Sequence, residues 1–205
     1  MSQFLKIYEE NPNQRHIGMV VDCLKKGGIV VIPTDTVYAF ACDMYNAKAL
    51  DKLCLLTGKK REKSNFSFIC YDLKHIADYA KQIDNQVFKL MKSLLPGPYT
   101  FILEANSSVP KMIRKKTTVG IRVPANQIAR TLVKELGNPI MSASLKSSKD
   151  NGEYMTDPEL IFEEFENQVD MVIDGGYGGY EPSTVINCLD NEIKLIRAGK
   201  GKIKI

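Results

Sequence analysis

Short β-branched runs alternate with amphipathic helical stretches along the whole chain, and this alternation constrains the fold more than any other feature. Residues 13–26 place apolar side chains on one helical face, and Gly27-Gly28 ends that helix. The β-branched run at residues 29–32 follows at once and predicts a buried strand that stops at Pro33. Because strands and helices interleave to the last residues, we expect one α/β domain with a mixed sheet.

The remaining helices and strands are predicted from the same alternation of amphipathic and β-branched segments. Further helices are expected at residues 47–56, after the N-caps Asp72 and Asp84, at residues 127–136 and after Asp157-Pro158. Further strands are expected at residues 66–70, 99–103, 119–123, 139–142, 171–173, 183–188 and 193–197. The glycine-rich stretch at residues 175–179 leads into no helix, so we interpret it as a wide loop and not as a dinucleotide-binding motif.

Composition excludes several classes of protein. Of 205 residues, 44% are hydrophobic and 25% are charged, which is typical of a globular chain and excludes disorder as the main state. The longest apolar run, residues 37–42, is far shorter than the ~20 residues of a membrane span, and the N-terminus does not resemble a secretory signal. Five scattered cysteines fit reduced thiols, and two histidines are too few for a His-rich metal centre. We therefore expect a cytoplasmic protein with no membrane partner and no metal-binding residues.

Positive charge is modest overall but clustered. The net charge of +4 does not by itself indicate nucleic-acid binding. The clusters are Lys59-Lys60-Arg61-x-Lys63, Arg114-Lys115-Lys116 and a basic tail of Lys200, Lys202 and Lys204. Such clusters can make a local positive surface, or they can be solvated loops and helix ends. Adjacent lysine and arginine side chains can also hold a polyphosphate, here without any P-loop sequence.

A polar segment, Pro33-Thr34-Asp35-Thr36-Val37-Tyr38, directly follows the first buried strand. Junctions of this kind are where α/β proteins commonly bind ligands, and threonine hydroxyls both donate and accept hydrogen bonds. The segment therefore suits a small zwitterion or a phosphate. The alternative is a turn whose side chains satisfy its own backbone.

Two arginines, Arg122 and Arg197, lie within β-branched strands. A buried guanidinium is costly without an anionic partner, so each of them is a candidate for anion binding. The alternatives are that each lies at an exposed edge or is paired with a carboxylate of the chain.

Five motifs follow one another in a fixed order: Lys-x-Gly-Gly-Ile-Val-x-x-Pro-Thr-Asp-Thr-Val-Tyr from Lys25 or Lys26, Pro96-Gly-Pro-x-Thr-x-Ile-Leu103, Gly120-Ile-Arg-Val-Pro124, Ser183-Thr-Val-Ile186 and Ile196-Arg-x-Gly199. Together they resemble the YrdC-like family, whose best-known activity is threonylcarbamoyl-AMP synthesis for tRNA modification. The resemblance covers residues 13–201, with residues 1–12 as an N-terminal strand or arm and 202–205 as the basic tail. The length and Asn65-Phe66-Ser67 look most like the YciO branch. The resemblance implies a twisted mixed sheet flanked by helices around a concave basic cleft.

Site residues are carried over from the same resemblance. The threonine site would contain Thr34, Thr36, Tyr38, Arg122 and Ser183. The nucleotide site would contain Lys60, Arg61, Ser144, Lys146 and Arg197. The implied reaction converts ATP, bicarbonate and L-threonine to threonylcarbamoyl-AMP and pyrophosphate, with Mg²⁺ accompanying ATP and no side chain acting as acid or base. The other implied partner is tRNA or double-stranded RNA.

The chain departs from the synthase pattern at several positions. The usual Lys-x-Arg-Pro places Gly58, Lys60 and Arg61 at its lysine, arginine and proline positions. The usual Ser-Ala-Asn reads Ser144-Leu145-Lys146, and Arg-x-Pro-x-His reads Arg122-Val-Pro-Ala-Asn126. An asparagine and a histidine that face the substrates are thereby lost. Two function classes follow: an enzyme that uses ATP, bicarbonate and threonine or a threonylcarbamoyl compound, and a non-enzymatic RNA-binding protein of the YciO type.

Overall fold

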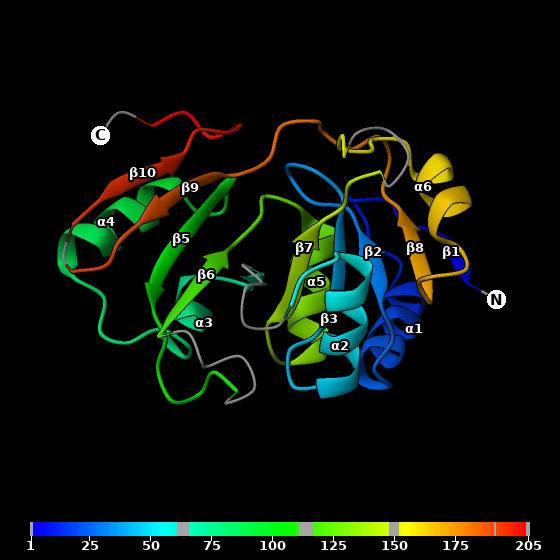
Figure 1. The fold of residues 1–205 in the computed structure, drawn as a ribbon, viewed down its shortest axis with the longest axis horizontal. Coiled ribbons are helices and arrows are strands. Elements are labelled where there is room, and N and C mark those ends of the chain that lie inside the picture. The colour runs from blue at the N-terminus through cyan, green and yellow to red at the C-terminus, as the bar shows by residue number, and fades with distance from the viewer. Residues whose placement is uncertain (1, 61–65, 111–116, 148–151, 191, 204–205) are drawn as a thin grey trace.

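A computed structural model of the chain describes residues 2–60, 66–110, 117–147, 152–190 and 192–203. Within these residues, ten strands form one mixed sheet in the order β1-β8-β2-β3-β7-β4-β6-β5-β9-β10. The strands are β1 (Gln3–Lys6), β2 (Val30–Ile32), β3 (Ala39–Asp43), β4 (Ser67–Ile69), β5 (Tyr99–Glu104), β6 (Thr118–Arg122), β7 (Ile140–Ser144), β8 (Met171–Asp174), β9 (Thr184–Asn187) and β10 (Lys194–Arg197). The expected fold class, a twisted mixed sheet flanked by helices, is confirmed (Figure 1).

The helices begin where side chains can accept hydrogen bonds from their first backbone N–H groups. They are α1 (Gln14–Lys25), α2 (Ala47–Leu56), α3 (Leu73–Ala77), α4 (Asn85–Leu94), α5 (Gln127–Leu136) and α6 (Pro158–Phe165). Asp72 and Asp84 cap α3 and α4 as the sequence predicts, and Asp157 caps α6 ahead of a proline in its first turn. None of the helices in the described part of the chain is long and apolar enough to cross a membrane.

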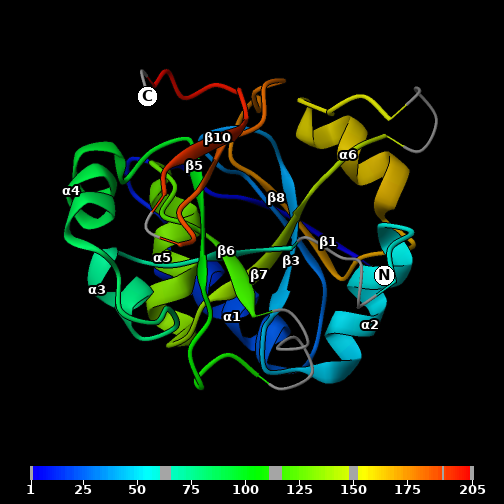
Figure 2. The ribbon, with the colours of Figure 1, turned by 60° about the vertical axis from the view of Figure 1, so that its left-hand side comes forward.

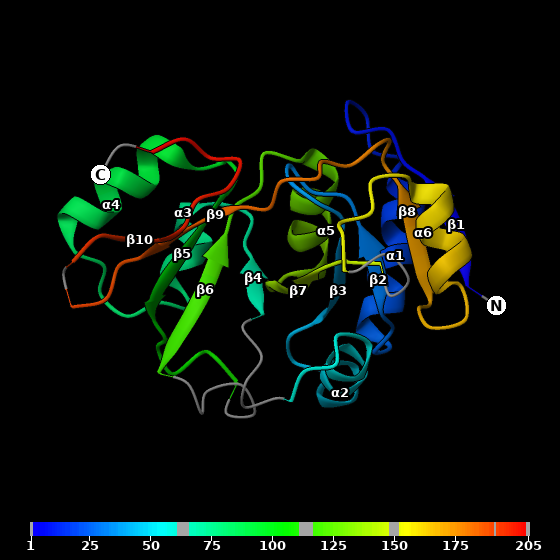
Figure 3. The ribbon, with the colours of Figure 1, turned by 45° about the horizontal axis from the view of Figure 1, so that its top comes forward.

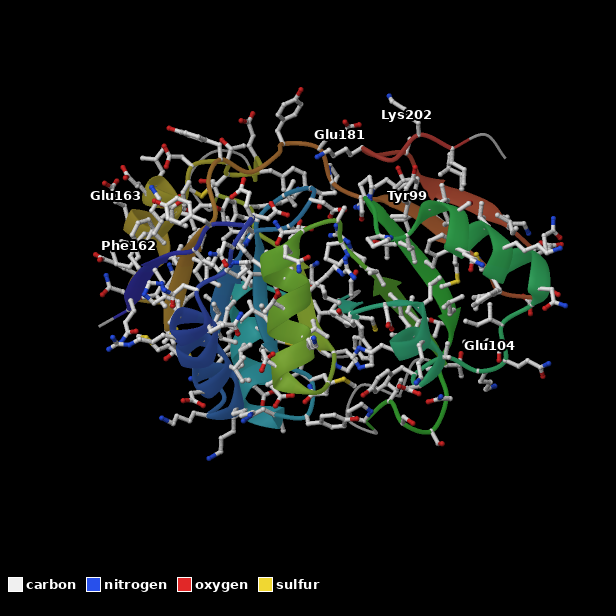
Figure 4. The ribbon with its side chains drawn as sticks, turned by 180° about the vertical axis from the view of Figure 1, so that it is seen from behind. Tyr99, Glu104, Phe162, Glu163, Glu181 and Lys202 are labelled. Carbon is white, nitrogen blue, oxygen red and sulfur yellow. The ribbon has the colours of Figure 1, made fainter. Side chains whose placement is uncertain are left out.

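Alternate residues of the central strands pack into two different cores. Val30 and Ile32 of β2 face α1 and α5, whereas Val31 faces the core to which α2 and α6 contribute. Figure 4 shows α1 and α5 side by side over the back of the sheet. Helices α3 and α4 lie beside β5 in the other half of the molecule (Figure 2). Helices therefore cover both faces of the sheet around β2, β3 and β8.

The sheet divides into two halves that separate at one end. β7 joins β4 through only the three residue pairs from Ser67↔Ser142 to Ile69↔Ile140, and β4 in turn pairs with β6. One half consists of β1, β8, β2, β3 and β7, and the other consists of β6, β5, β9 and β10. Figure 3 shows these two halves diverging from this narrow connection. The loop from β8 to β9 then crosses from the first half to the second (Figure 1). This divergence opens the space in which the candidate site lies.

One strand was not anticipated. β3 lies between β2 and β7 and is buried along most of its length, so the uniformly apolar run at residues 37–42 shows no alternation that would indicate a strand. The N-terminal arm contains β1, which pairs in parallel with β8 at the edge of the sheet.

Candidate functional site

A cavity of about 830 Å³ lies between the two halves of the sheet. Of the described residues that line it, four are cationic and none is acidic: Lys59, Arg122, Lys146 and Arg197. Hydroxyl side chains line it as well, namely those of Thr57, Ser67, Thr100, Thr118, Ser142, Ser144, Ser147, Tyr154 and Ser183. The chemistry of this lining favours an anionic ligand that needs many hydrogen-bond partners.

Arg122 ends strand β6 and forms part of the cavity wall. Its Nη2 donates to Asp35 Oδ1 at 2.8 Å and to Thr36 Oγ1 at 2.9 Å. Only 6% of the residue is exposed, and its Nε is a buried donor without a hydrogen-bond partner. Burial lowers the pKa of Arg122, Asp35 opposes that shift, and nearby Arg197 adds to it. The alternative of pairing with a carboxylate is thus correct for Arg122, although the residue still lines the cavity.

Hydrogen bonds among Thr34, Thr36 and Val37 stabilise the loop that carries Asp35, and Thr36 also accepts a hydrogen bond from Arg122. Thr34 Oγ1 donates to Val37 O at 2.7 Å, so the 3.0 Å contact between the two threonine hydroxyls has Thr36 as donor. The Thr36 amide also donates to Thr34 Oγ1. Both hydroxyl hydrogens are therefore used inside the loop. Thr34 and Thr36 lie behind the cavity wall and support Arg122.

Tyr38 also lies outside the described lining of the cavity. Its ring is fully buried, its hydroxyl donates to Gly176 O at 2.6 Å, and that hydroxyl accepts from the Gly175 amide. Burial raises the pKa of Tyr38 to about 12. A side chain at Gly178 would collide with the Tyr38 ring, so this glycine is needed for the close approach of the β8–β9 loop. Tyr38 anchors that loop, which is the wide loop expected from the sequence.

A second arginine, Arg197, lies on the exposed edge strand β10, as the other alternative supposes. Its guanidinium donates twice to Ser183 O, at 2.7 and 3.2 Å. Ser183 Oγ is in turn 2.8 Å from Thr100 Oγ1 on β5. All three side chains line the cavity together with Arg122. They form one cationic, hydroxyl-rich wall, which we call the arginine wall: Thr100, Arg122, Ser183 and Arg197.

The cavity has a further cationic region at Lys59 and Lys146. Lys59 follows α2, and its Nζ lies 5.8 Å from the centre of the Phe66 ring. Lys146 follows β7, and its Nζ lies 4.9 Å from the centre of the Tyr154 ring. Ser144, at the end of β7, is exposed and lines the same cavity.

Within the lysine cluster, the family resemblance assigns Lys60 and Arg61 to the nucleotide site, but the described residue of the cluster that lines the cavity is Lys59. Lys60 is exposed and is not among the described lining residues, whereas its neighbour Lys59 is. Arg61 lies outside the described residues. The sequence does not predict the apolar part of the lining, because its residues cannot be distinguished in sequence from ordinary core residues. They are Phe40, Leu50, Leu56, Phe66, Phe68 and Phe165.

Thiol chemistry has no support in this arrangement. The five cysteines form no disulfide, and none is among the described residues that line the cavity. Burial raises the pKa of Cys23 and of Cys188 to about 11, so neither is ionised near neutral pH.

Comparison with known proteins gives consistent results. The family profile described as "Sua5_yciO_yrdC: Telomere recombination" matches residues 22–199. The Escherichia coli K12 protein named "Uncharacterized protein YciO" is 40% identical over 207 residues, covering 100% of this chain and 98% of the relative. A threonylcarbamoyl-AMP synthase of Coxiella burnetii is 29% identical over 180 residues, covering 86% and 95%.

Solved structures agree with these relatives. The crystal structure of E. coli YciO matches with a TM-score of 0.91 at 40% identity, covering 100% of this chain and 98% of that one. A structure of P. abyssi Sua5 complexed with L-threonine matches with a TM-score of 0.87 at 25% identity. It covers 97% of this chain and 58% of that longer one.

Proposed function

This chain belongs to the Sua5, YciO and YrdC family, and on that premise we propose that it binds L-threonine and ATP in the cavity and forms threonylcarbamoyl-AMP. The observation that carries the proposal is Arg122, a buried cation in the wall of a cavity whose described lining contains four cations and no carboxylate. Relatives named threonylcarbamoyl-AMP synthase, and a relative complexed with L-threonine, support it. The product would serve tRNA modification, as the family resemblance implies.

Threonine and ATP suit different parts of the cavity lining. We assign the threonine carboxylate to the arginine wall, because guanidinium groups bind carboxylates through charge-assisted hydrogen bonds. We assign the ATP phosphates to Lys59, Lys146 and Ser144, since ammonium groups act as point charges toward phosphate. The apolar lining around Phe66 and Leu56 remains for the nucleobase.

The proposed reaction needs orientation and charge stabilisation more than side-chain acid–base chemistry. The threonine amine attacks the carbon of bicarbonate, water leaves, and an N-carbamate forms. A carbamate oxygen then bonds to the α-phosphorus of ATP, the bond from that phosphorus to the bridging oxygen breaks, and pyrophosphate leaves with the electron pair. Fixed cations and hydroxyls stabilise the phosphate charge and hold the reactants in line.

Mg²⁺ enters this scheme as part of the MgATP substrate. The described residues contain no group of three or more His, Cys, Asp or Glu side chains that could hold a metal ion. Mg²⁺ is commonly held by substrate phosphates and water with little help from protein ligands, so the lining needs to supply only the remaining positive charge.

A second candidate function is RNA binding without catalysis. Exposed Lys59 at the cavity, its exposed neighbour Lys60 and Lys146, which stands where the synthases have asparagine, favour it. These cations would contact the phosphates of tRNA or double-stranded RNA.

Calorimetric titration with L-threonine tests the first proposal. Arg122→Ala should weaken threonine binding by roughly 2–4 kcal/mol, because a charge-assisted pair is lost. Arg15→Ala is the matched control, since Arg15 is exposed on α1 and lies outside the described lining. Equal threonine affinity in the Arg122→Ala variant and the wild type would remove Arg122 from the site.

A further inference from the structure

The last described residues, 198–203, form a strap that lies against β5 and β9. The Lys200 amide donates to Pro182 O at 2.9 Å, and the Gly199 amide donates to Thr184 Oγ1 at 3.0 Å. Thr184 Oγ1 donates to Gly201 O, and the Tyr99 hydroxyl donates to Lys202 O at 2.9 Å. Figure 4 shows Tyr99 and Lys202 at the same edge of the molecule. The backbone of the strap is therefore fixed to the half of the sheet that consists of β6, β5, β9 and β10.

The side chain of Lys200 leaves this strap and reaches the other half. Its Nζ donates to the backbone oxygen of Asp35 at 2.5 Å. Asp35 belongs to the loop between β2 and β3, 165 residues earlier in the chain. Lys200 thus joins the strap to the loop that supports the arginine wall.

The effect of this Lys200 contact on the site depends on the two hydrogen bonds that the Asp35 carboxylate accepts. One carboxylate oxygen accepts from Arg122 Nη2 at 2.8 Å, and the other accepts from the Ala125 amide at 3.0 Å. The carboxylate and the oxygen held by Lys200 belong to the same residue. A displacement of the Asp35 backbone therefore moves the group that orients the Arg122 guanidinium, and small displacements strongly affect an anion site.

We propose that Lys200 is a positioning residue: by holding the backbone of Asp35, it keeps Arg122 in the orientation that binds the carboxylate of the ligand. The inference rests on the proposed threonine site. Lys200 does not contact the ligand itself in this proposal. It acts through Asp35, and the strap gives it a fixed origin on the opposite half of the sheet.

The test compares Lys200→Met, which keeps the aliphatic stem and removes the donor, with Lys200→Arg, which keeps a cationic donor. Lys194→Met is the matched control, because Lys194 is an exposed cation on neighbouring β10 whose ion pair is with Glu192. Each protein is titrated with L-threonine by calorimetry. Amide hydrogen exchange in the ligand-free protein is followed at Ala125, which reports the Asp35 carboxylate, and at Ala129, which bonds to Asn126 and should not change.

Lys200→Met should weaken threonine binding about fivefold to tenfold and speed exchange at Ala125, while Lys200→Arg restores both and Lys194→Met alters neither. Thermal stability should stay near that of the wild type, because the Lys200 side chain is exposed. Unchanged exchange at Ala125, or faster exchange with unchanged threonine affinity, would overturn the proposal. If the wild type binds no threonine, the proposed function fails instead, and exchange at Ala125 alone decides whether Lys200 holds Asp35 in place.

Discussion

Asp35 and Arg122 form an ion pair of 2.8 Å that joins the two diverging halves of the sheet. Asp35 comes from the loop between β2 and β3, and Arg122 ends β6 in the other half. Each side chain is only 7% exposed, so neither charge can be satisfied by bulk water if the other is removed. The pair therefore has two roles: it stabilises the fold and it fixes the cation that we assign to the ligand carboxylate.

Removal of Asp35 should destabilise the protein strongly. In Asp35→Ala, the Arg122 charge stays buried without its partner, and the Ala125 amide loses its acceptor. The expected loss is roughly 3–5 kcal/mol in the free energy of unfolding, measured by urea denaturation. Asp22→Ala, at an exposed position of α1, is the control. A loss below about 1 kcal/mol would mean that Arg122 finds another partner or becomes hydrated.

His75 should make stability depend on pH on the acidic side of neutrality. Its Nδ1 lies 3.2 Å from the Tyr71 amide, which donates to it when the ring is neutral. Burial lowers the pKa of His75 from its ordinary 6.5, and Asp78 and Asp72 oppose that shift. The unfolded chain therefore binds more protons between the two pKa values, so this contribution is complete above pH 6.5 and is lost as the pH falls through the folded value.

Urea denaturation of the wild type and His75→Gln from pH 5 to pH 7.5 measures this effect. The wild type should lose more stability than the variant as the pH falls across this range, because glutamine does not titrate. Parallel stability curves for the two proteins would show that His75 has the same pKa in both states.

Lys146→Asn tests the assignment of the ATP phosphates. The substitution restores the asparagine of the synthase pattern but removes a cation from the cavity lining, so the KM for ATP should rise several-fold. Lys134→Asn is a matched control, since Lys134 also lies over a tyrosine ring, that of Tyr71, outside the described lining. Faster formation of product with an unchanged KM would show instead that the asparagine amide makes the more useful contact.

The RNA-binding alternative predicts a strong dependence on salt. The logarithm of affinity should fall against the logarithm of salt concentration with a slope of about −0.7 to −0.9 per phosphate neutralised. A double variant, Lys59→Ala with Lys60→Ala, should make that slope less steep. A flat salt dependence in the wild type would rule out phosphate contacts as the basis of binding.

Local features of the fold could be predicted well from the sequence. The helix at residues 127–136 has the expected bounds because Asn126 caps it and Gly137, with φ of +85°, ends it in a left-handed conformation. β3 could not be recognised, since burial on both faces removes the alternation that identifies a strand.

Long-range pairings at the site could not be predicted in the same way. The motif around Thr34 and Thr36 indicated a ligand site, but their hydroxyls support Arg122 from behind the cavity wall. Asp35 lies 87 residues from Arg122 and 165 residues from Lys200, and no spacing in a single sequence connects them. Only the folded sheet brings these three residues together.

The function proposed for this cavity is the formation of threonylcarbamoyl-AMP. The most direct measurement is mass spectrometry of the products after incubation of the wild type with MgATP, bicarbonate and each amino acid in turn, together with pyrophosphate release. We expect a carbamoyl adenylate and pyrophosphate with L-threonine, and much less of both products with Arg122→Ala. Pyrophosphate release that is independent of the amino acid, or ATP and threonine that are recovered unchanged, would contradict it.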